Sequence, residues 1–190
     1  MLKTYLESLK SAFKKFAEKR EIFDVVLYGS AAKGKEDARD TDILLIFNKK
    51  SLKERSETGE EFKKIIDKIK NADIKTINLE ELFNKDFIAR QGILVEGYSL
   101  IHSKHFSKLL GFLGYSLFTY NLKNLNHNEK TKFTYALIGR NEEGIIKKIG
   151  AESIGKGVVI VPSFNSSIME EFLEKWKINY NKKNILVSSI

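Results

Sequence analysis

Residues suited to phosphate chemistry lie in one short segment near the start of the chain. Gly29 and Ser30 end an apolar, β-branched run from Phe23 to Tyr28, which predicts a buried strand that closes in a tight turn. In such a turn the backbone N–H groups and the serine hydroxyl are accessible and can hold a phosphate group. Lys33 and Lys35 follow in a polar loop and would add positive charge to this nucleotide-binding site.

Two aspartates follow this loop. Asp40 and Asp42 come immediately before the apolar run from Ile43 to Phe47, which predicts a second strand. Side chains two residues apart on a strand point to the same face of the sheet. Carboxylate oxygens are also the ligands that Mg²⁺ prefers. We therefore expect Asp40 and Asp42 to bind Mg²⁺ beside a triphosphate that the turn holds.

This segment resembles the signature of the DNA-polymerase-β-like nucleotidyltransferases, particularly the minimal nucleotidyltransferases of archaea and bacteria. The shared pattern is a hydrophobic strand, the pair Gly29-Ser30, a short loop, and two acids separated by one residue before another hydrophobic strand. The resemblance covers residues 1 to about 100. It implies an Mg²⁺-dependent enzyme that transfers a nucleoside monophosphate from an NTP to a hydroxyl group.

The acids fit the family pattern in two registers. In the first, Asp40 and Asp42 are both metal ligands, and this register is favoured because Ile43 to Phe47 then continues the buried strand. In the second, Asp42 is the first acid and Leu44 replaces the second, which implies an inactive site.

Active members of the family have a third carboxylate, on a later strand, that acts as general base or completes the metal site. A strand is expected from Ile74 to Leu79, and Asp73 at its start is the candidate. Lys75 lies two residues further on, at the position that the family's acid would take. A second hypothesis therefore stays open, in which the protein keeps the fold and binds nucleotide or nucleic acid but has lost catalysis.

The surrounding elements predict an α/β (α+β) fold, a small mixed sheet with flanking helices on one face. An apolar stripe from Leu2 to Phe16 predicts a leading helix. Thr58 and Glu61 have the spacing of a capping box and predict the start of a second helix. We expect residues 1–103 to form the nucleotidyltransferase-like domain.

Residues 104–190 are expected to form a basic C-terminal α+β domain. Two β-like runs flank Gly155-Lys156-Gly157 and predict a hairpin. The net charge of the chain is +8, and residues 101–190 hold 13 of the 33 Lys and Arg but only 7 of the 25 Asp and Glu. This excess favours nucleic acid as a partner of the second half. The aromatic residues of this half, Phe118 and Phe133 among them, are expected mainly to form its core rather than to stack on bases.

Composition limits the remaining possibilities. The chain has no cysteine, which excludes disulfides and thiolate zinc sites and suits a cytoplasmic protein. No apolar run reaches the ~18–20 residues that a membrane-spanning helix requires, so we expect no membrane partner.

Overall fold

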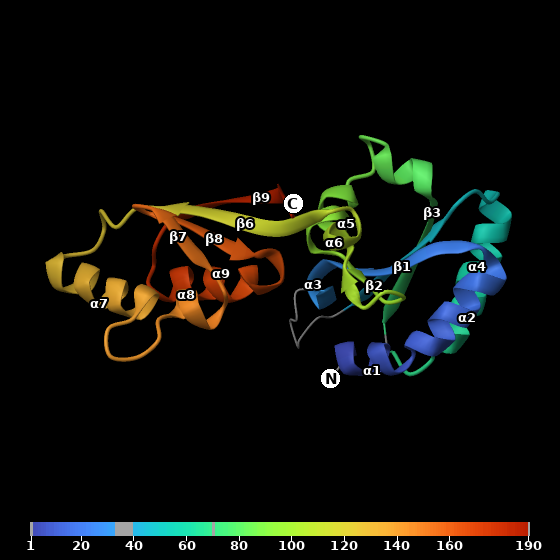
Figure 1. Cartoon of the computed structure of the whole chain (residues 1–190), viewed down its shortest axis with the longest axis horizontal. Helices are drawn as coiled ribbons and strands as arrows, with labels where there is room; N and C mark the ends of the chain where they lie inside the picture. Colours follow the sequence, from blue (N-terminus) through green and yellow to red (C-terminus); the bar gives the residue numbers. More distant parts are fainter. Residues whose placement is uncertain (1, 33–39, 70, 190) are drawn as a thin grey trace. The chain divides into compact units, whose positions relative to one another are not determined.

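The computed structural model describes residues 2–32, 40–69 and 71–189. The chain divides into two compact units, Met1–Gly111 and Phe112–Ile190 (Figure 1). The sequence placed this boundary earlier, between residues 103 and 104. The first unit extends further because Lys104 and His105 pair with its sheet and the next residue, Phe106, is buried in its core.

The first unit contains a five-stranded sheet in the order β3-β2-β1-β4-β5. Its strands are β1 (Ile22–Tyr28), β2 (Thr41–Phe47), β3 (Ala72–Asn78), β4 (Tyr98–Ser99) and β5 (Lys104–His105). The sheet is mixed, because β2 runs antiparallel to β1 and parallel to β3. Its helices are α1 (Leu2–Ser8), α2 (Lys10–Arg20), α3 (Gly29–Ala32), α4 (Leu52–Ile65), η1 (Leu79–Phe83), α5 (Arg90–Glu96) and α6 (Phe106–Leu109). The predicted mixed sheet is thus confirmed.

Helices cover both faces of this sheet, so the prediction of a single covered face was wrong. Successive residues of β1 and β2 belong to two different core clusters, as side-chain alternation requires. One cluster packs against α1, α2 and α4 through Leu6, Phe13 and Phe62. The other packs against η1, α5 and α6 through Leu82, Ile93 and Phe106, and Figure 1 shows these two sets of helices on opposite sides of the sheet.

Helix α4 begins earlier than the helix start that was predicted at Thr58. Ser51 caps α4, and its capping box is completed by Glu54. Thr58 lies inside the helix, where its hydroxyl donates a hydrogen bond to the carbonyl oxygen of Glu54. Both segments have the Ser/Thr-x-x-Glu spacing, so this local pattern does not by itself choose between them.

The second unit is an antiparallel four-stranded sheet in the order β7-β8-β6-β9. Its elements are β6 (Phe112–Tyr120), α7 (His127–Ile138), α8 (Ile145–Lys148), β7 (Glu152–Gly155), β8 (Val158–Pro162), η2 (Ser163–Asn165), α9 (Ser166–Lys175) and β9 (Tyr180–Ser188). Strands β7 and β8 form the predicted hairpin. Apart from the short α8 and η2, the element order is β-α-β-β-α-β, which is that of ferredoxin-like α+β folds.

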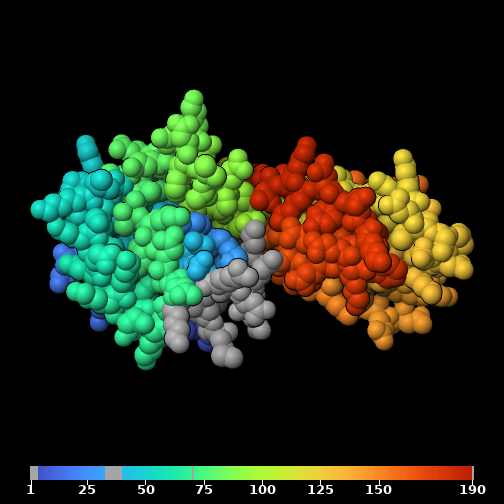
Figure 2. All heavy atoms as spheres, turned by 180° about the vertical axis from the view of Figure 1, so that it is seen from behind, coloured from blue at the N-terminus to red at the C-terminus, as the bar shows by residue number. Residues whose placement is uncertain are grey.

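The core of the second unit lies between one face of its sheet and the helices α7 and α9. Phe118, Phe133 and Leu173 are fully or almost fully buried there. Phe118 and Phe133 therefore belong to the core, as expected. The edge strand β9, in red in Figure 2, is exposed along most of its length. Among the described residues of both units, no helix combines the length and apolar character needed to cross a membrane.

Candidate active site

Three polar side chains, those of Tyr28, Asp42 and Asp73, form a row across the first sheet, where β1 ends and β2 and β3 begin. We call this set the acid row. Tyr28 pairs with Asp42 in the antiparallel β1–β2 ladder, and Asp42 pairs with Asp73 in the parallel β2–β3 ladder. Directly paired residues of neighbouring strands point to the same face of a sheet. The sheet therefore brings together two carboxylates that are far apart in the sequence.

Gly29 lies directly against the Asp42 carboxylate. Its φ of 71° is in the left-handed region, which glycine adopts without strain. A Cβ atom at this position would overlap Oδ2 of Asp42 and would lie 3.3 Å from its Cγ. Glycine is thus required twice here, for the turn that ends β1 and for the close approach of the carboxylate.

The charges around Asp42 act in opposite directions. Burial raises the pKa of the Asp42 carboxyl; Lys75 lowers this pKa, whereas the negative charges of Asp73 and Asp40 raise it further. The Lys75 ammonium also forms an ion pair with Asp73, with 3.4 Å between Nζ and Oδ2. Because three carboxylates repel one another here, a bound cation would stabilise their ionised forms.

Lys75 also faces Tyr28 on the same side of the sheet. Interaction with the Tyr28 phenolate, which forms only at high pH, is the main cause that raises the pKa of the Lys75 ammonium, and Asp73 contributes in the same direction. Burial raises the pKa of the Tyr28 hydroxyl. This hydroxyl has no hydrogen bond of normal geometry among the described residues. Lys75 is therefore a charged group within the row formed by Tyr28, Asp42 and Asp73.

The other predicted site residues have different surroundings. Asp40 is exposed in a bend immediately before β2. Ser30 is half-buried in α3, the four-residue helix that Gly29 begins. Lys33 and Lys35 lie outside the described residues. Leu44, which one register puts in place of an acid, is completely buried in the core.

The acids suit a hard divalent cation in kind, because carboxylate oxygens are the usual ligands of Mg²⁺. Within residues 2–32, 40–69 and 71–189, however, no group of three or more His, Asp or Glu side chains is arranged to hold a metal ion. Two pairs of carboxylates are compatible with a metal site, Asp42 with Asp40 and Asp42 with Asp73.

The sequence pattern indicates Lys75 beside the acids but gives no sign of its neighbour Tyr28. Period-2 alternation from Asp73 puts Lys75 on the acid face, and this signal is local. The proximity of Tyr28 depends on the register of three strands, which no local pattern in the sequence specifies.

Comparison with known protein families gives one match to the first unit. Residues 9–99 match the family "Polymerase beta, Nucleotidyltransferase". Residues 9–99 form a nucleotidyltransferase domain of the polymerase-β type. This nucleotidyltransferase domain contains Gly29, Asp42 and Asp73, and it ends before the second unit begins.

Two solved structures are similar over about half of the chain. One is a tri-AMPylated Shewanella oneidensis HEPN toxin in complex with an MNT antitoxin, with 15% identity and a TM-score of 0.36 over 50% of this chain and 71% of that chain. The other is a mutant of the toxin–antitoxin pair MntA–HpeT, with 14% identity and a TM-score of 0.36 over 48% of this chain and 70% of that chain. A search of curated proteins gives no match.

Proposed function

We propose that the nucleotidyltransferase domain transfers a nucleoside monophosphate from an NTP to a hydroxyl acceptor and uses Mg²⁺. The observation that carries this proposal is the pairing of Asp42 with Asp73 beside the Gly29 turn. Gly29 and Ser30 would hold the phosphate groups, and Asp40 and Asp42 would hold the metal ion.

In this reaction the acceptor oxygen attacks the α-phosphorus and forms the new P–O bond. The bond between the α-phosphorus and the oxygen bridging to the β-phosphate breaks, and pyrophosphate leaves. Asp73 would accept the proton of the acceptor hydroxyl, a contribution of ~10²–10⁴ in rate for a well-placed general base. When bound, Mg²⁺ would neutralise charge that develops on the phosphate oxygens.

One observation favours a second candidate, a nucleotide-binding protein without catalysis. The Lys75 ammonium lies within ion-pair distance of Asp73 and lowers the pKa of Asp42, so it already supplies positive charge to both acids. An ammonium group in this position could bind triphosphate oxygens directly as a point charge. In that case nucleotide binding would need Lys75 rather than a metal ion.

The test is calorimetric titration of ATP, GTP, CTP and UTP with and without Mg²⁺. We expect Mg²⁺-dependent binding that Asp42→Asn abolishes. Asp67→Asn is the matched control, because Asp67 is exposed and outside the row. If none of the four nucleotides binds, the proposed transferase is refuted.

A second variant, Lys75→Met, separates the two candidates. The transferase predicts that this variant still binds NTP with Mg²⁺ and, once an acceptor is supplied, still releases pyrophosphate. The inactive nucleotide-binding protein predicts Mg²⁺-independent binding that Lys75→Met removes. Circular dichroism of each variant verifies that the protein is folded.

A further inference from the structure

The second unit contains a cavity of about 630 Å³ that has no assigned ligand. Its wall is formed by the end of β6, the connector from β6 to α7, one side of α7, and the turn of the β7–β8 hairpin. The connector and α7, in yellow in Figure 2, lie at the surface of this unit. A volume in this range is typical of pockets for small organic ligands.

The cavity is positively charged. Lys123, Lys130 and Lys156 line it, and none of its lining residues is acidic. All three lysines are exposed, and none forms an ion pair with any residue that the structure describes. They come from the connector, the helix and the hairpin turn, so three separate segments bring positive charge to one cavity. A negatively charged ligand would therefore meet no repulsion from the cavity wall.

The same cavity has an apolar and aromatic wall. Tyr120, Leu122 and Ile138 line it, and Ile138 is 58% exposed. The Tyr120 ring is held edge-on against the buried Phe133, with 5.6 Å between the ring centroids. Burial raises the pKa of the Tyr120 hydroxyl. A ligand with a flat apolar group and a negative charge would match both parts of this wall.

The hairpin turn keeps its position through backbone contacts. The Tyr120 N–H donates a hydrogen bond of 2.8 Å to the carbonyl oxygen of Gly157. Gly157 has a φ of 73°, and a Cβ there would overlap the Tyr120 carbonyl oxygen. Lys156 is thus attached to a turn that is fixed against β6.

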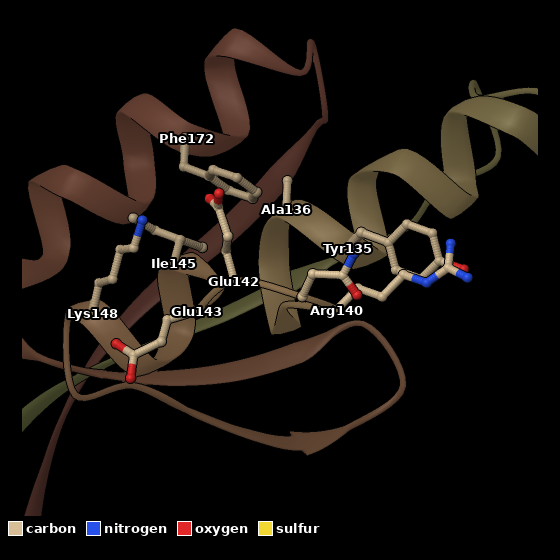
Figure 3. Close-up of a pocket in the computed structure, with 9 residues that line it drawn as sticks. Tyr135, Ala136, Arg140, Glu142, Glu143, Ile145, Lys148 and Phe172 are labelled. Atoms are coloured by element: carbon tan, nitrogen blue, oxygen red, sulfur yellow. The ribbon is translucent and has the colours of Figure 1, made fainter.

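A neighbouring cavity of about 610 Å³ has a different character (Figure 3). There Arg140 already lies on the Tyr135 ring, with 4.9 Å from its Cζ to the ring centroid. Glu142 and Glu143 also line that cavity, so its charges are mixed. The cavity with three lysines is the one whose charge selects an anion.

We propose that this cavity binds a nucleotide unit, with the base against Tyr120 and the phosphate at Lys123, Lys130 and Lys156. A nucleotide combines a flat aromatic ring with negative charge, which matches both parts of the wall. Every base can stack on an aromatic side chain, whatever the nucleotide sequence. Lysines bind phosphate as point charges. This site is separate from the acid row, and the proposal does not depend on transfer by the nucleotidyltransferase domain.

The test uses the full chain with Asp42→Asn and without Mg²⁺, so that the acid row does not contribute to metal-dependent nucleotide binding. The probes are fluorescein-labelled hexa-adenylate, followed by anisotropy, and AMP, followed by calorimetry. Trp176 is the only tryptophan and packs on Phe133 at 5.6 Å, so its emission reports binding near the cavity wall. The triple variant Lys123→Ala/Lys130→Ala/Lys156→Ala is compared with Lys132→Ala/Lys175→Ala/Lys183→Ala, which removes three exposed lysines outside the cavity.

We expect the cavity variant to lose about tenfold in affinity, as for three exposed ion pairs, and the control variant to lose much less. With the oligonucleotide, the slope of log affinity against log salt concentration should become less negative by about 2, because three phosphate contacts are lost. Thr134→Phe, which fills the cavity without changing its charge, should also weaken binding.

Binding of both probes indicates a free nucleotide site, and binding of hexa-adenylate alone indicates a site for a nucleic-acid strand. No binding of either probe, or equal losses in the two triple variants, overturns the proposal.

Discussion

Asp24 is a buried carboxyl whose ionisation is expected to reduce the stability of the first unit. It is 1% exposed at the start of β1. Its Oδ1 accepts hydrogen bonds of 2.7 Å from the Val25 N–H and from the Ser99 hydroxyl. Its Oδ2 has no partner among the described residues. Burial raises the pKa of this carboxyl from 3.8 to about 6, against the smaller opposite effect of the two hydrogen bonds.

The change in the free energy of unfolding with pH follows from the number of protons that the folded and the unfolded chain bind. Between pH 3.8 and about 6 the folded chain retains the Asp24 proton that the unfolded chain releases. The free energy of unfolding therefore falls as pH rises through this window and is constant, for this group, above it. A shift of about 2 pKa units corresponds to ~3 kcal/mol.

Asp24→Asn is expected to remove this penalty. The asparagine keeps an acceptor at Oδ1 but places an amide in the position of Oδ2, where an unpaired polar group costs ~1 kcal/mol. At pH 7.5 the variant should therefore be more stable than the parent by ~2 kcal/mol, the difference between these two effects. Below pH 4 the parent carboxyl is protonated and its ionisation penalty is absent, so only the cost of the unpaired amide is left and the variant should be less stable than the parent by ~1 kcal/mol.

The assay is urea unfolding followed by circular dichroism at several pH values from 3.5 to 8, a range set by the expected pKa of about 6. Asp67→Asn, at an exposed position, is the control for removal of one negative charge. Trp176 lies in the second unit, so the urea transition followed by its fluorescence should be the same in Asp24→Asn and in the parent. A stability difference between Asp24→Asn and the parent that is the same at pH 4 and pH 7.5 would refute the reasoning.

Three further predictions test other contacts. Gly29→Ala should cost ~1–2 kcal/mol from its left-handed backbone alone, and it should abolish Mg²⁺-dependent NTP binding in calorimetry because the new Cβ displaces the Asp42 carboxylate. Glu81→Ala leaves the buried Arg55 guanidinium without its carboxylate and should cost ~2 kcal/mol in urea unfolding, less than a fully buried pair because the Glu81 side chain is 43% exposed. Gly157→Ala should shift the hairpin away from β6 and lower both the unfolding temperature and hexa-adenylate affinity, while an unchanged affinity would contradict the role given to the turn.

Local patterns in the sequence were sufficient to locate the strand–turn–strand around Gly29. The apolar runs, the glycine at a turn and the two-residue spacing of Asp40 and Asp42 are all properties of adjacent residues. They predicted β1 and β2 within a residue or two, and the family match confirms the resemblance that they carried. The start of α4 was misplaced because Ser51 and Thr58 both satisfy the same local capping pattern.

Two parts of the fold depended on packing rather than on local pattern. Strands β1 and β2 are apolar on both faces, because both faces of the first sheet are covered by helices. The same apolar pattern also fits a strand with helices on one side and a loop on the other, so the sequence alone did not distinguish these two arrangements. The end of the first unit was misplaced because the burial of Phe106 is a contact with a distant core.

The composition of the acid row was likewise decided by tertiary structure. Asp42 and Asp73 are brought together only because β3 pairs in parallel with β2, and α4 lies between these two strands in the chain. The approach of Lys75 to Tyr28 requires a third strand in register. The sequence by itself determined which residues can do chemistry at the Gly29 turn, since those signals are local. Tertiary structure decided which charges face one another there, because strand pairing between distant segments sets those distances.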